Sequence, residues 1–425
     1  MSEKSKKRVK LDRAVARHGN IQATGRFRAL LGILGKALIV VLVSTLTVTT
    51  VSAIQLAGKF GAGEIDVPTG DGSDREIPPI NGPINMLLVG SDSREGAGNS
   101  AFGDTSGVLA DVIILMHISE DRQNAVALSF PRDLLVPWPA CPSTTGGPGY
   151  YAQSLGQINA TIANGGPGCT LLTVEKLTGL NIPYLAMVDF NGVIELSNAV
   201  GGVEVCVAED IEDEYTNTYL KKGMHTLQGV QALQFLRTRH GVGDGSDLGR
   251  ISNQQVYLTS LVRKLKSKDI LSNPVALYSL AQAAAEHMKL SKTLSNPTTL
   301  MAIANALKDI PMKKITFLQL PSVSGLPAPN QGRVMPDYEK AQVLFDLMKN
   351  DQPLVLGEVN NTGAGSEVAP TPKPSSTSTA TPKPSSTATP KPSSTATPTP
   401  TPTPTVTPLP DWAQGTNAQT TTCSK

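Results

Sequence analysis

The first half of the chain contains three apolar stretches with the length and composition of buried strands. Ile84 to Gly90, Val112 to Ile118 and Asn124 to Phe130 are rich in branched aliphatic residues, which favour β structure. The polar residues Ser119 to Gln123 separate the last two stretches. Such a short polar break between two strand patterns predicts a β-hairpin.

Charged residues stand where these predicted strands begin or end. Asp92 follows the first stretch, Asp111 precedes the second and Arg132 follows the third. If the first strand runs alongside the third, all three positions meet at one edge of the sheet. Ligands bind at such strand ends in layered α/β proteins, so this edge is a candidate functional site.

After these strands the chain changes to helical periodicity. Apolar residues recur at helical spacing in four segments, and one more strand pattern lies between the last two of them. In chain order these are Leu155 to Ala163, Thr170 to Thr178, Phe190 to Val200, the strand Val203 to Val207, and Thr226 to Leu236. The alternation of strands and helices indicates an α/β layered domain.

Before the strands, a basic arm leads into a long apolar segment. Residues 1–36 carry ten Lys or Arg against two acidic residues, so the net charge of +2 hides a remainder with 27 basic and 33 acidic residues. Residues 37–57 are long enough to form a transmembrane helix, and its basic flank is expected on the cytoplasmic side. We therefore expect a single-pass protein of the cell membrane, with the arm in the cytoplasm and the rest of the chain outside.

Two alternatives exist for this N-terminal region. Val51-Ser52-Ala53 resembles a cleavage site, so the apolar segment could be a signal peptide, although its basic region is long for one. The arm could also bind nucleic acid. It lacks a helix-turn-helix pattern and interleaved aromatic residues, so we expect no nucleic-acid partner.

The composition of the remaining chain suggests domain boundaries. We interpret residues 58–81 as a linker, 82–268 as the main folded domain and 269–352 as its helical extension. Residues 353–425 are rich in Pro, Thr and Ser, and the unit Thr-Pro-Lys-Pro-Ser-Ser-Thr-Ala recurs in them. Such a composition cannot bury a core, so we expect a disordered, extended tail.

All four cysteines follow the predicted membrane span, in a compartment that permits disulfides. Cys141 and Cys169 flank a Gly/Pro-rich stretch and are expected to form a bridge. Cys206 lies in an apolar strand pattern, and we expect it to be a buried hydrophobic residue. A zinc site is not expected, because no Cys-x-x-Cys occurs and the five histidines are scattered.

The segment from Phe235 to Gln255 gathers arginines around a glycine-rich loop. Arg237 and Arg239 follow one predicted helix, and Arg250 and Gln254 lie four residues apart on one face of the next. Arginine donates to phosphate oxygens two at a time, and glycine lets a backbone approach them closely. The segment predicts a diphosphate site. The alternative is a solvated arginine cluster with surface ion pairs.

The second of these helices has further features that favour an anion. It opens at Asp247, which we expect to be its N-cap. We expect Arg250 and Gln254 to stand off its buried stripe, in the first turns of the helix. The helix dipole favours a negative charge there.

A diphosphate beside two carboxylates suggests a divalent cation. Asp92 and Asp111 are the expected ligands, because magnesium is usually held by one or two carboxylates together with phosphate oxygens. The alternative is that both are ordinary turn or strand-edge aspartates. The sequence contains neither a Gly-x-x-x-x-Gly-Lys phosphate loop nor a Gly-x-Ser-x-Gly elbow.

Four ordered motifs resemble those of the LytR-CpsA-Psr family. They are Asn85 to Arg94, Ser129 to Asp133, Gly201 to Val203 and the arginine segment, and the resemblance covers roughly residues 82–266. It implies a catalytic domain outside the membrane, with three α/β/α layers and a central mixed β-sheet. It also implies transfer of a glycan from a polyprenyl diphosphate to peptidoglycan, through a phosphodiester link.

The resemblance also implies roles for single residues. Carried over to this chain, the diphosphate ligands are Arg132, Arg237, Arg239, Arg250 and Gln254, and the magnesium ligands are Asp92 and Asp111. The expected catalytic residues are Asp92, Arg132, Asp133 and Arg239, with Asp92 or Asp133 accepting a proton. A pyrophosphatase and a binding module for lipid-linked glycans are alternatives. A transcriptional attenuator is disfavoured, because only the short arm could bind DNA.

The chain departs from the family pattern in two places. Leu109-Ala110-Asp111-Val112 stands where Arg-Ser-Asp-Thr is frequent. Asn253 occupies a position where many members have arginine. Both departures remove groups that could contact phosphate.

Overall fold

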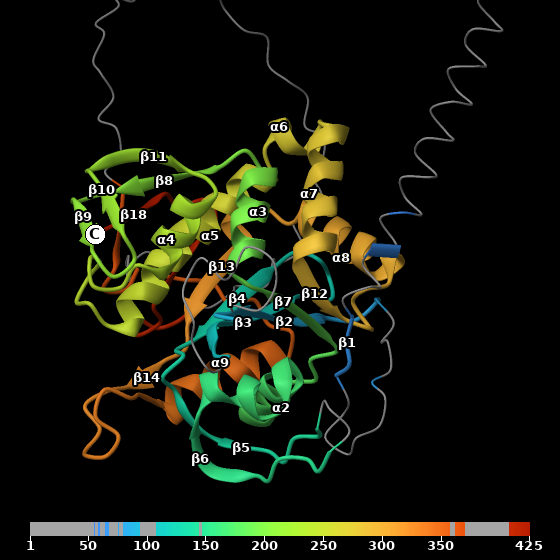
Figure 1. The fold of residues 1–425 in the computed structure, drawn as a ribbon, viewed down its shortest axis with the longest axis vertical. Helices are drawn as coiled ribbons and strands as arrows, with labels where there is room; N and C mark the ends of the chain where they lie inside the picture. Colours follow the sequence, from blue (N-terminus) through green and yellow to red (C-terminus); the bar gives the residue numbers. More distant parts are fainter. Residues whose placement is uncertain are drawn as a thin grey trace, which may run out of the picture. The chain divides into compact units, whose positions relative to one another are not determined.

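A mixed sheet of eight strands lies at the centre of the described part of the chain, in the order β1-β12-β7-β2-β3-β4-β13-β17 (Figure 1). The computed structural model describes residues 55, 58–59, 64–67, 75, 80–93, 108–143, 147–357, 362–369 and 408–425. The strands of this sheet are β1 (Glu64–Ile65), β2 (Ile84–Ser91), β3 (Ala110–Ile118), β4 (Ala125–Phe130), β7 (Tyr184–Val188), β12 (Met288–Ser291), β13 (Ile315–Gln319) and β17 (Gly415–Asn417). Strands β3 and β4 pair antiparallel, so the predicted hairpin is confirmed.

The directions of the strands determine which of their ends meet. Strand β3 lies between β2 and β4 and is antiparallel to both. The end of β2, the start of β3 and the end of β4 therefore share one edge of the sheet, as the sequence predicted, although β2 and β4 are not neighbours. Strand β7 is parallel to β2, and β13 is parallel to β4.

Helices cover both faces of the sheet, which gives three layers (Figure 1). Alternate residues of a strand point to opposite faces. Ile113 and Leu115 of β3 accordingly belong to a core shared with α2 and α9, and Ile114 belongs to a core shared with α5 and α8. The helices are α2 (Gly166–Thr178), α3 (Phe190–Ala199), α4 (Val230–Arg237), α5 (Asp247–Leu265), α6 (Lys268–Leu271), α7 (Pro274–His287), α8 (Pro297–Asp309) and α9 (Tyr338–Lys349).

A second, smaller sheet packs against α4 and α5. It has the order β11-β8-β18-β16, with β8 (Val203–Val207), β11 (Gly223–Leu227), β16 (Ser366–Val368) and β18 (Thr422–Ser424). Val205, Phe235 and Tyr257 lie in the core between this sheet and the two helices. The predicted strand at Val203 to Val207 is therefore confirmed, but it lies outside the central sheet.

Three pairs of short strands and two 3₁₀ helices complete the described fold. They are the hairpins β5 (Leu135–Trp138) with β6 (Gln153–Gln157) and β9 (Ile211–Asp213) with β10 (Thr218–Leu220), the pair β14 (Ser322–Val323) with β15 (Met335–Pro336), and the 3₁₀ helices η2 (Ile158–Asn164) and η3 (Met312–Lys314). The predicted helices at Thr170 to Thr178 and Phe190 to Val200 correspond to α2 and α3. The helix predicted from Leu155 begins only at Ile158, because β6 ends at Gln157. The helix predicted from Thr226 begins at Val230, because β11 ends at Leu227.

The predicted domain boundaries cut through these sheets. Strands β12 and β13 come from the supposed extension 269–352, and β1 comes from the supposed linker 58–81. The prediction of a wholly disordered tail is wrong for residues 362–369, which include β16, and for residues 408–425, which supply β17 and β18. Residues 370–407, which contain most of the Pro/Thr repeat, lie outside the described residues.

The cysteines form two disulfides. Cys141 pairs with Cys169, which confirms that prediction. Cys206 pairs with Cys423 across 217 residues of sequence, so the expectation of an unpaired buried Cys206 is wrong. The physical reason is the parallel pairing of β18 with β8, in which Cys423 lies opposite Cys206 with 4.4 Å between their Cα atoms.

The membrane prediction falls on residues that the structure does not describe. The arm 1–36 and, apart from Gln55, the span 37–57 belong to them. Within the described ranges, no helix combines the length and the apolar character needed to cross a bilayer.

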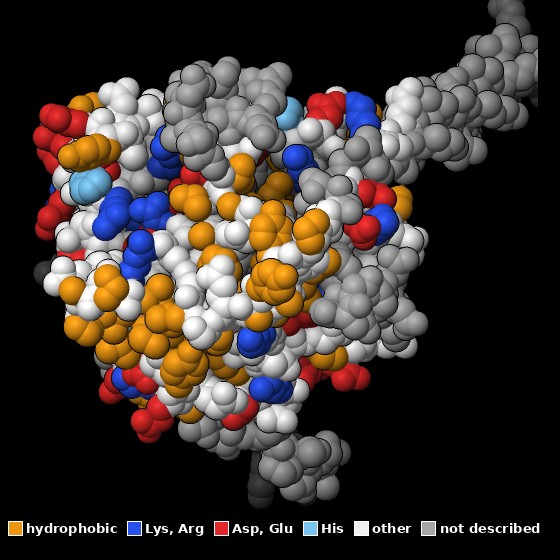
Figure 2. Space-filling view, turned by 60° about the horizontal axis from the view of Figure 1, so that its bottom comes forward, with side chains coloured by type: hydrophobic (Ala, Val, Ile, Leu, Met, Phe, Trp, Pro, Cys, Tyr) orange, Lys and Arg blue, Asp and Glu red, His pale blue; other side chains and the backbone are white. Residues whose placement is uncertain are grey.

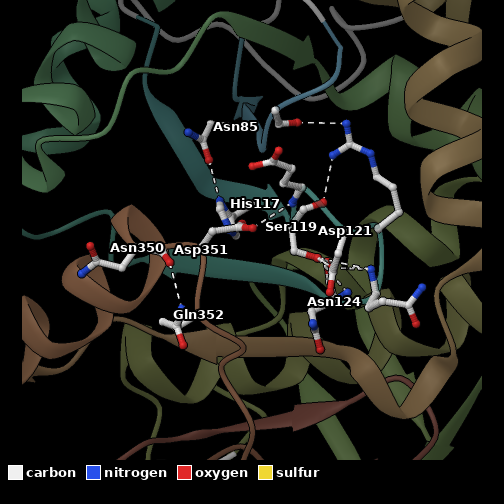
Figure 3. Close-up of polar contacts among 12 residues, drawn as sticks. Asn85, His117, Ser119, Asp121, Asn124, Asn350, Asp351 and Gln352 are labelled. Atoms are coloured by element: carbon white, nitrogen blue, oxygen red, sulfur yellow. Dashed lines mark hydrogen bonds and ion pairs between the residues drawn. The ribbon is translucent and has the colours of Figure 1, made fainter. Parts of the chain in front are cut away.

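A polar cluster fixes the end of β3 that lies away from Asp111 (Figure 3). His117 is buried, and its two ring nitrogens lie 2.8 Å from Asn85 Oδ1 and 3.1 Å from Asp351 Oδ1. Asp351 Oδ2 also accepts a hydrogen bond from Glu120 N. The cluster ties the residues after α9 to the central sheet. His117 lies six positions along β3 from Asp111, about 20 Å at 3.3 Å per residue.

Candidate functional site

The strand ends predicted to meet bring together a carboxylate and an arginine. Asp111 is the second residue of β3, and Arg132 follows β4 in the segment Phe130-Pro131-Arg132. Arg132 Nη1 donates to Asp111 Oδ1 at 2.8 Å. Because β3 and β4 are antiparallel neighbours, the start of one strand and the end of the other must lie together.

Asp247 joins this pair to the first turn of α5. Its carboxylate accepts from the backbone N–H of Arg132 at 3.1 Å, and Oδ1 lies 3.3 Å from Arg132 Nε and 2.8 Å from Arg250 Nη2. Arg250 Nη2 also donates to the backbone carbonyl of Asp111 at 2.8 Å. Two arginines and two aspartates therefore form one network across three elements.

The structure corrects the predicted beginning of α5. Ser246 is the N-cap, because its side chain accepts from Gly249 N at 3.1 Å, and Asp247 is the first helical residue. Arg250 and Gln254 do not stand off the buried stripe, since only 4% and 6% of their surfaces are exposed. They are buried because α5 packs against the central sheet, the second sheet and α4 at once.

Arg237 and Arg239 reach the same site from the other side. Arg237 is the last residue of α4, and its guanidinium lies 4.5 Å from the centre of the Phe190 ring. Arg239 Nε donates to the carbonyl of Gly245 at 2.9 Å. The loop between α4 and α5 is thus folded back on itself through an arginine side chain.

A buried carboxylate, Asp213 at the end of β9, holds the start of this loop. It accepts hydrogen bonds at 3.0 Å from the backbone N–H groups of Arg239, His240 and Tyr215. Burial acts to raise the pKa of Asp213, but these three hydrogen bonds outweigh it, and the pKa lies below its ordinary value. The carboxylate is therefore ionised and orients the Arg239 backbone.

Two further predicted residues, Asp133 and Asp92, have different surroundings. Asp133 lies 3.7 Å from Arg132 Nε and accepts from Gln157 Nε2. Burial, and then the negative charge of Asp247, raise the pKa of Asp133 above its ordinary value, against the effect of three arginines. Asp92 follows β2, where its Oδ1 accepts from Leu109 N at 2.6 Å.

Two cavities meet at these side chains. One, of about 210 Å³, lies between the sheet and helices α3, α4 and α5. Its walls are mainly apolar, and its polar lining includes Asp111, Arg237, Arg250 and Gln254. The other, of about 160 Å³, is lined by Asp111, Arg132, Asp213, Tyr215, Thr216, Arg237, Arg239, His240 and Arg250.

Asp111, Arg237 and Arg250 line both cavities, so an apolar chamber adjoins a basic one. Among the described residues, the linings of these two chambers include Asp111 but not Asp92. Figure 2 shows one face on which Lys and Arg side chains gather beside a histidine and hydrophobic side chains.

One glycine of the arginine loop packs against the protein itself. Gly243 has a φ of +55°, and a Cβ there would lie 2.8 Å from the carbonyl oxygen of Ala364. Gly243 N donates to the carbonyl of Lys425 at 2.6 Å. This glycine therefore lets the loop pack on two C-terminal segments of the same chain.

Sequence reasoning missed Asp213 as a site residue and assigned Asp247 only a capping role. Asp247 had a visible signal, because an acidic residue three positions before Arg250 lies on the same side of a helix. No sequence pattern pointed to Asp213 as a site residue, because 26 positions separate it from Arg239. Asn253 is buried, and its side chain bonds to the Phe235 carbonyl and to Ser424 Oγ.

With this geometry the protein can be placed among known families. The chain belongs to the LytR_cpsA_psr family, whose model matches residues 61–349. The solved LytR-Csp2A-Psr enzyme from Actinomyces oris shares the fold, with a TM-score of 0.50 and 23% identity over 67% of this chain and 95% of that one.

Two curated relatives carry functional names. The cell wall biosynthesis protein LcpA from Corynebacterium glutamicum is 30% identical over 63% of this chain and 57% of its own length. TagT from Bacillus subtilis, named a polyisoprenyl-teichoic acid–peptidoglycan teichoic acid transferase, is 28% identical over 57% of this chain and 70% of its own. The chain thus spans less than two thirds of LcpA.

Proposed function

We propose that this protein transfers a glycopolymer from a polyprenyl diphosphate carrier to peptidoglycan and forms a phosphodiester link. The observation that carries the proposal is the junction of an apolar chamber with a basic one at Asp111, Arg237 and Arg250. An isoprenoid chain suits the first chamber and a diphosphate suits the second. The name of TagT states a polyisoprenyl-linked substrate, which agrees with the apolar chamber.

The arginines would hold the diphosphate and stabilise the charge that develops on it. Arg132 and Arg250 are held in place by Asp111 and Asp247, so little reorganisation is needed when the substrate binds. Arg237 and Arg239 complete the basic wall. Electrostatic positioning of this kind accounts for most of the catalysis in phosphoryl transfer.

The reaction needs a group that accepts a proton, and Asp133 is our candidate. A hydroxyl oxygen of peptidoglycan attacks the phosphorus nearer the sugar, and its proton passes to the Asp133 carboxylate. The bond from that phosphorus to the bridging oxygen breaks, and polyprenyl phosphate leaves. The raised pKa of Asp133, which lies beside Arg132, suits a group that must take up a proton.

A magnesium ion at this site would need ligands from the substrate. In the part of the chain that the structure describes, no three His, Cys, Asp or Glu side chains cluster as metal ligands. Asp92 and Asp111 would therefore hold the ion with phosphate oxygens as further ligands, which is usual for magnesium. The bound ion would neutralise negative charge on the diphosphate.

The test is a transfer assay with the full-length chain in detergent, a polyprenyl diphosphate-linked glycan and peptidoglycan. Arg132→Ala, Arg237→Ala, Arg239→Ala and Arg250→Ala should each lower the rate of transfer about 10- to 150-fold, because a charge-assisted contact contributes about 1.5–3 kcal/mol. Arg237→Lys should also largely fail, since a point charge cannot donate in bidentate fashion. Val193→Phe, which fills the apolar chamber, should weaken binding of the lipid but not of inorganic diphosphate.

The products distinguish the alternatives. A transferase yields a peptidoglycan-linked glycan, a pyrophosphatase yields free phosphorylated glycan, and a binding module yields no product. Unchanged calorimetric affinity of the arginine variants for a polyprenyl diphosphate would contradict the proposed site. Lys221→Ala is a matched control, because Lys221 is exposed and its ion-pair partners among the described residues, Asp210 and Glu212, lie outside the site.

A further inference from the structure

The arrangement of the two chambers indicates where the glycan of a bound lipid would lie. In the proposed function, on which this inference rests, the lipid fills the apolar chamber and the phosphates lie near the shared residues Arg237 and Arg250. The glycan must then leave through the part of the basic chamber that is not shared. That part includes Tyr215, Thr216 and His240.

Tyr215 and His240 form an aromatic pair at this place. Their ring centres are 4.4 Å apart, with 38° between the ring planes. Tyr215 is 81% exposed, and the His240 side chain is 53% exposed. An aromatic residue this exposed contributes little to the core, and its ring is accessible to a ligand in the basic chamber that it lines.

The exposed pair is nevertheless held by a fixed backbone. The N–H groups of Tyr215 and His240 both donate to the buried carboxylate of Asp213, at 3.0 Å each. The same carboxylate orients Arg239. One anchor thus sets the distance between the aromatic pair and an arginine of the basic chamber, so that both can contact one ligand.

We propose that Tyr215, supported by the His240 ring, binds the first sugar residue attached to the diphosphate. The C–H face of a pyranose is apolar, and a rigid aromatic face gives it a large contact at a small cost in conformational entropy. The occupant is therefore a hexose or N-acetylhexosamine directly linked to the diphosphate. The acceptor glycan approaches the same phosphorus from elsewhere.

The experiment compares two ligands on the full-length protein in detergent. One is polyprenyl diphosphate without sugar, and the other is polyprenyl diphosphate that carries a single N-acetylhexosamine. Tyr215→Ala should lower the affinity for the sugar-bearing lipid about three- to tenfold, a change that matches the strength of an aromatic contact. Its affinity for the bare lipid should stay at the wild-type value, and Tyr215→Phe should restore sugar binding.

Tyr219→Ala is the matched control. Tyr219 lies in the same β9–β10 hairpin and is 58% exposed, but it does not line the basic chamber. We expect it to bind both lipids like the wild type. An unchanged melting temperature for Tyr215→Ala would show that the hairpin is intact.

Three results would overturn the inference in distinguishable ways. Equal losses for both lipids in Tyr215→Ala would place Tyr215 at the phosphates and not at the sugar. Unchanged affinity of Tyr215→Ala for the sugar-bearing lipid would show that Tyr215 does not bind the sugar, but it would leave the proposed function intact. Failure of the wild type to bind even the bare lipid would contradict the proposed function itself, and with it the proposed sugar contact of Tyr215.

Discussion

At the scale of single residues, the site depends on carboxylates that hold arginines in place. Asp247 lies between Arg132 and Arg250, and Asp213 lies behind Arg239. Both aspartates are buried. A buried carboxylate is stable when it is paired or hydrogen-bonded. Asp247 pairs with two guanidinium groups proposed to bind the diphosphate, whereas Asp213 accepts from backbone N–H groups, including that of Arg239.

The first prediction concerns the pH dependence of transfer. Asp133 must be ionised to accept a proton, and its pKa is raised above the ordinary value of 3.8. The rate should therefore fall as the pH decreases through this raised pKa. Asp133→Asn should lower kcat by about 10²–10⁴ while the affinity for polyprenyl diphosphate changes little, as calorimetry would show. A fully active Asp133→Asn variant would assign the base to another group.

The second prediction concerns stability. Asp213→Ala leaves three backbone N–H groups without their acceptor, and each unpaired buried donor costs about 1–3 kcal/mol. The free energy of unfolding, measured with urea at pH 7, should fall accordingly. Asp210→Ala is the control, because this exposed carboxylate pairs with Lys221 at the surface, where an ion pair contributes little.

The effect of Asp213→Ala on the free energy of unfolding should depend on pH. Because the pKa of folded Asp213 is lowered, its ionisation stabilises the fold above the ordinary value of 3.8. That contribution is lost as the pH falls through the folded-state pKa below that value. The difference in unfolding free energy between wild type and Asp213→Ala should therefore narrow in acid. A difference that stays constant down to pH 2 would argue against the carboxylate as its source.

At the scale of elements, the C-terminal strand β18 supports the arginine loop. Its residue Cys423 is bonded to Cys206 of β8, and Ser424 Oγ donates to Asn253 of α5. Lys425 accepts from Gly243 in the loop between α4 and α5. A strand from the far end of the chain thus contacts the loop that carries Arg239.

The third prediction follows from this contact. Replacing both Cys206 and Cys423 by serine should lower the free energy of unfolding by about 2–5 kcal/mol and weaken binding of polyprenyl diphosphate. The matched control replaces Cys141 and Cys169, whose disulfide holds the segment before α2 and not the arginine loop. It should reduce stability without reducing affinity. Equal losses of affinity in both double variants would contradict the role of β18.

At the scale of the whole molecule, the proposed reaction requires the site to lie outside the cytoplasm and near a membrane. The fourth prediction is that a reporter fused after Lys425 is active outside the membrane and that the intact protein sediments with it. If residues 37–57 span the membrane, the charge bias around them would orient the chain in this way. Deletion of residues 1–57 should release the protein. Recovery of a soluble natural form beginning near Ile54 would instead support a cleaved signal peptide.

What the sequence determined by itself is local. Strands β2, β3 and β4 were predicted because a continuous apolar stretch and its turn are read within a few residues. The arginine segment was recognised for the same reason, since Arg237, Arg239 and Arg250 lie within 14 residues of one another. Antiparallel pairing of adjacent strands then sufficed to place Asp111 beside Arg132.

What only the tertiary structure decided involves partners far apart in the chain. Strands β12, β13 and β17 join the central sheet after long connections, and their patterns alone do not name their neighbours. Cys206 and Cys423 meet because β8 pairs with β18, and Asp213 of β9 meets Arg239 because the loop after α4 folds against the β9–β10 hairpin. The sequence therefore indicated the chemical groups of the site. Only the tertiary structure showed which carboxylates orient these groups and that an aromatic pair lies beside them. The reason is that the burial of a side chain and its distance from a remote residue are set when the chain folds.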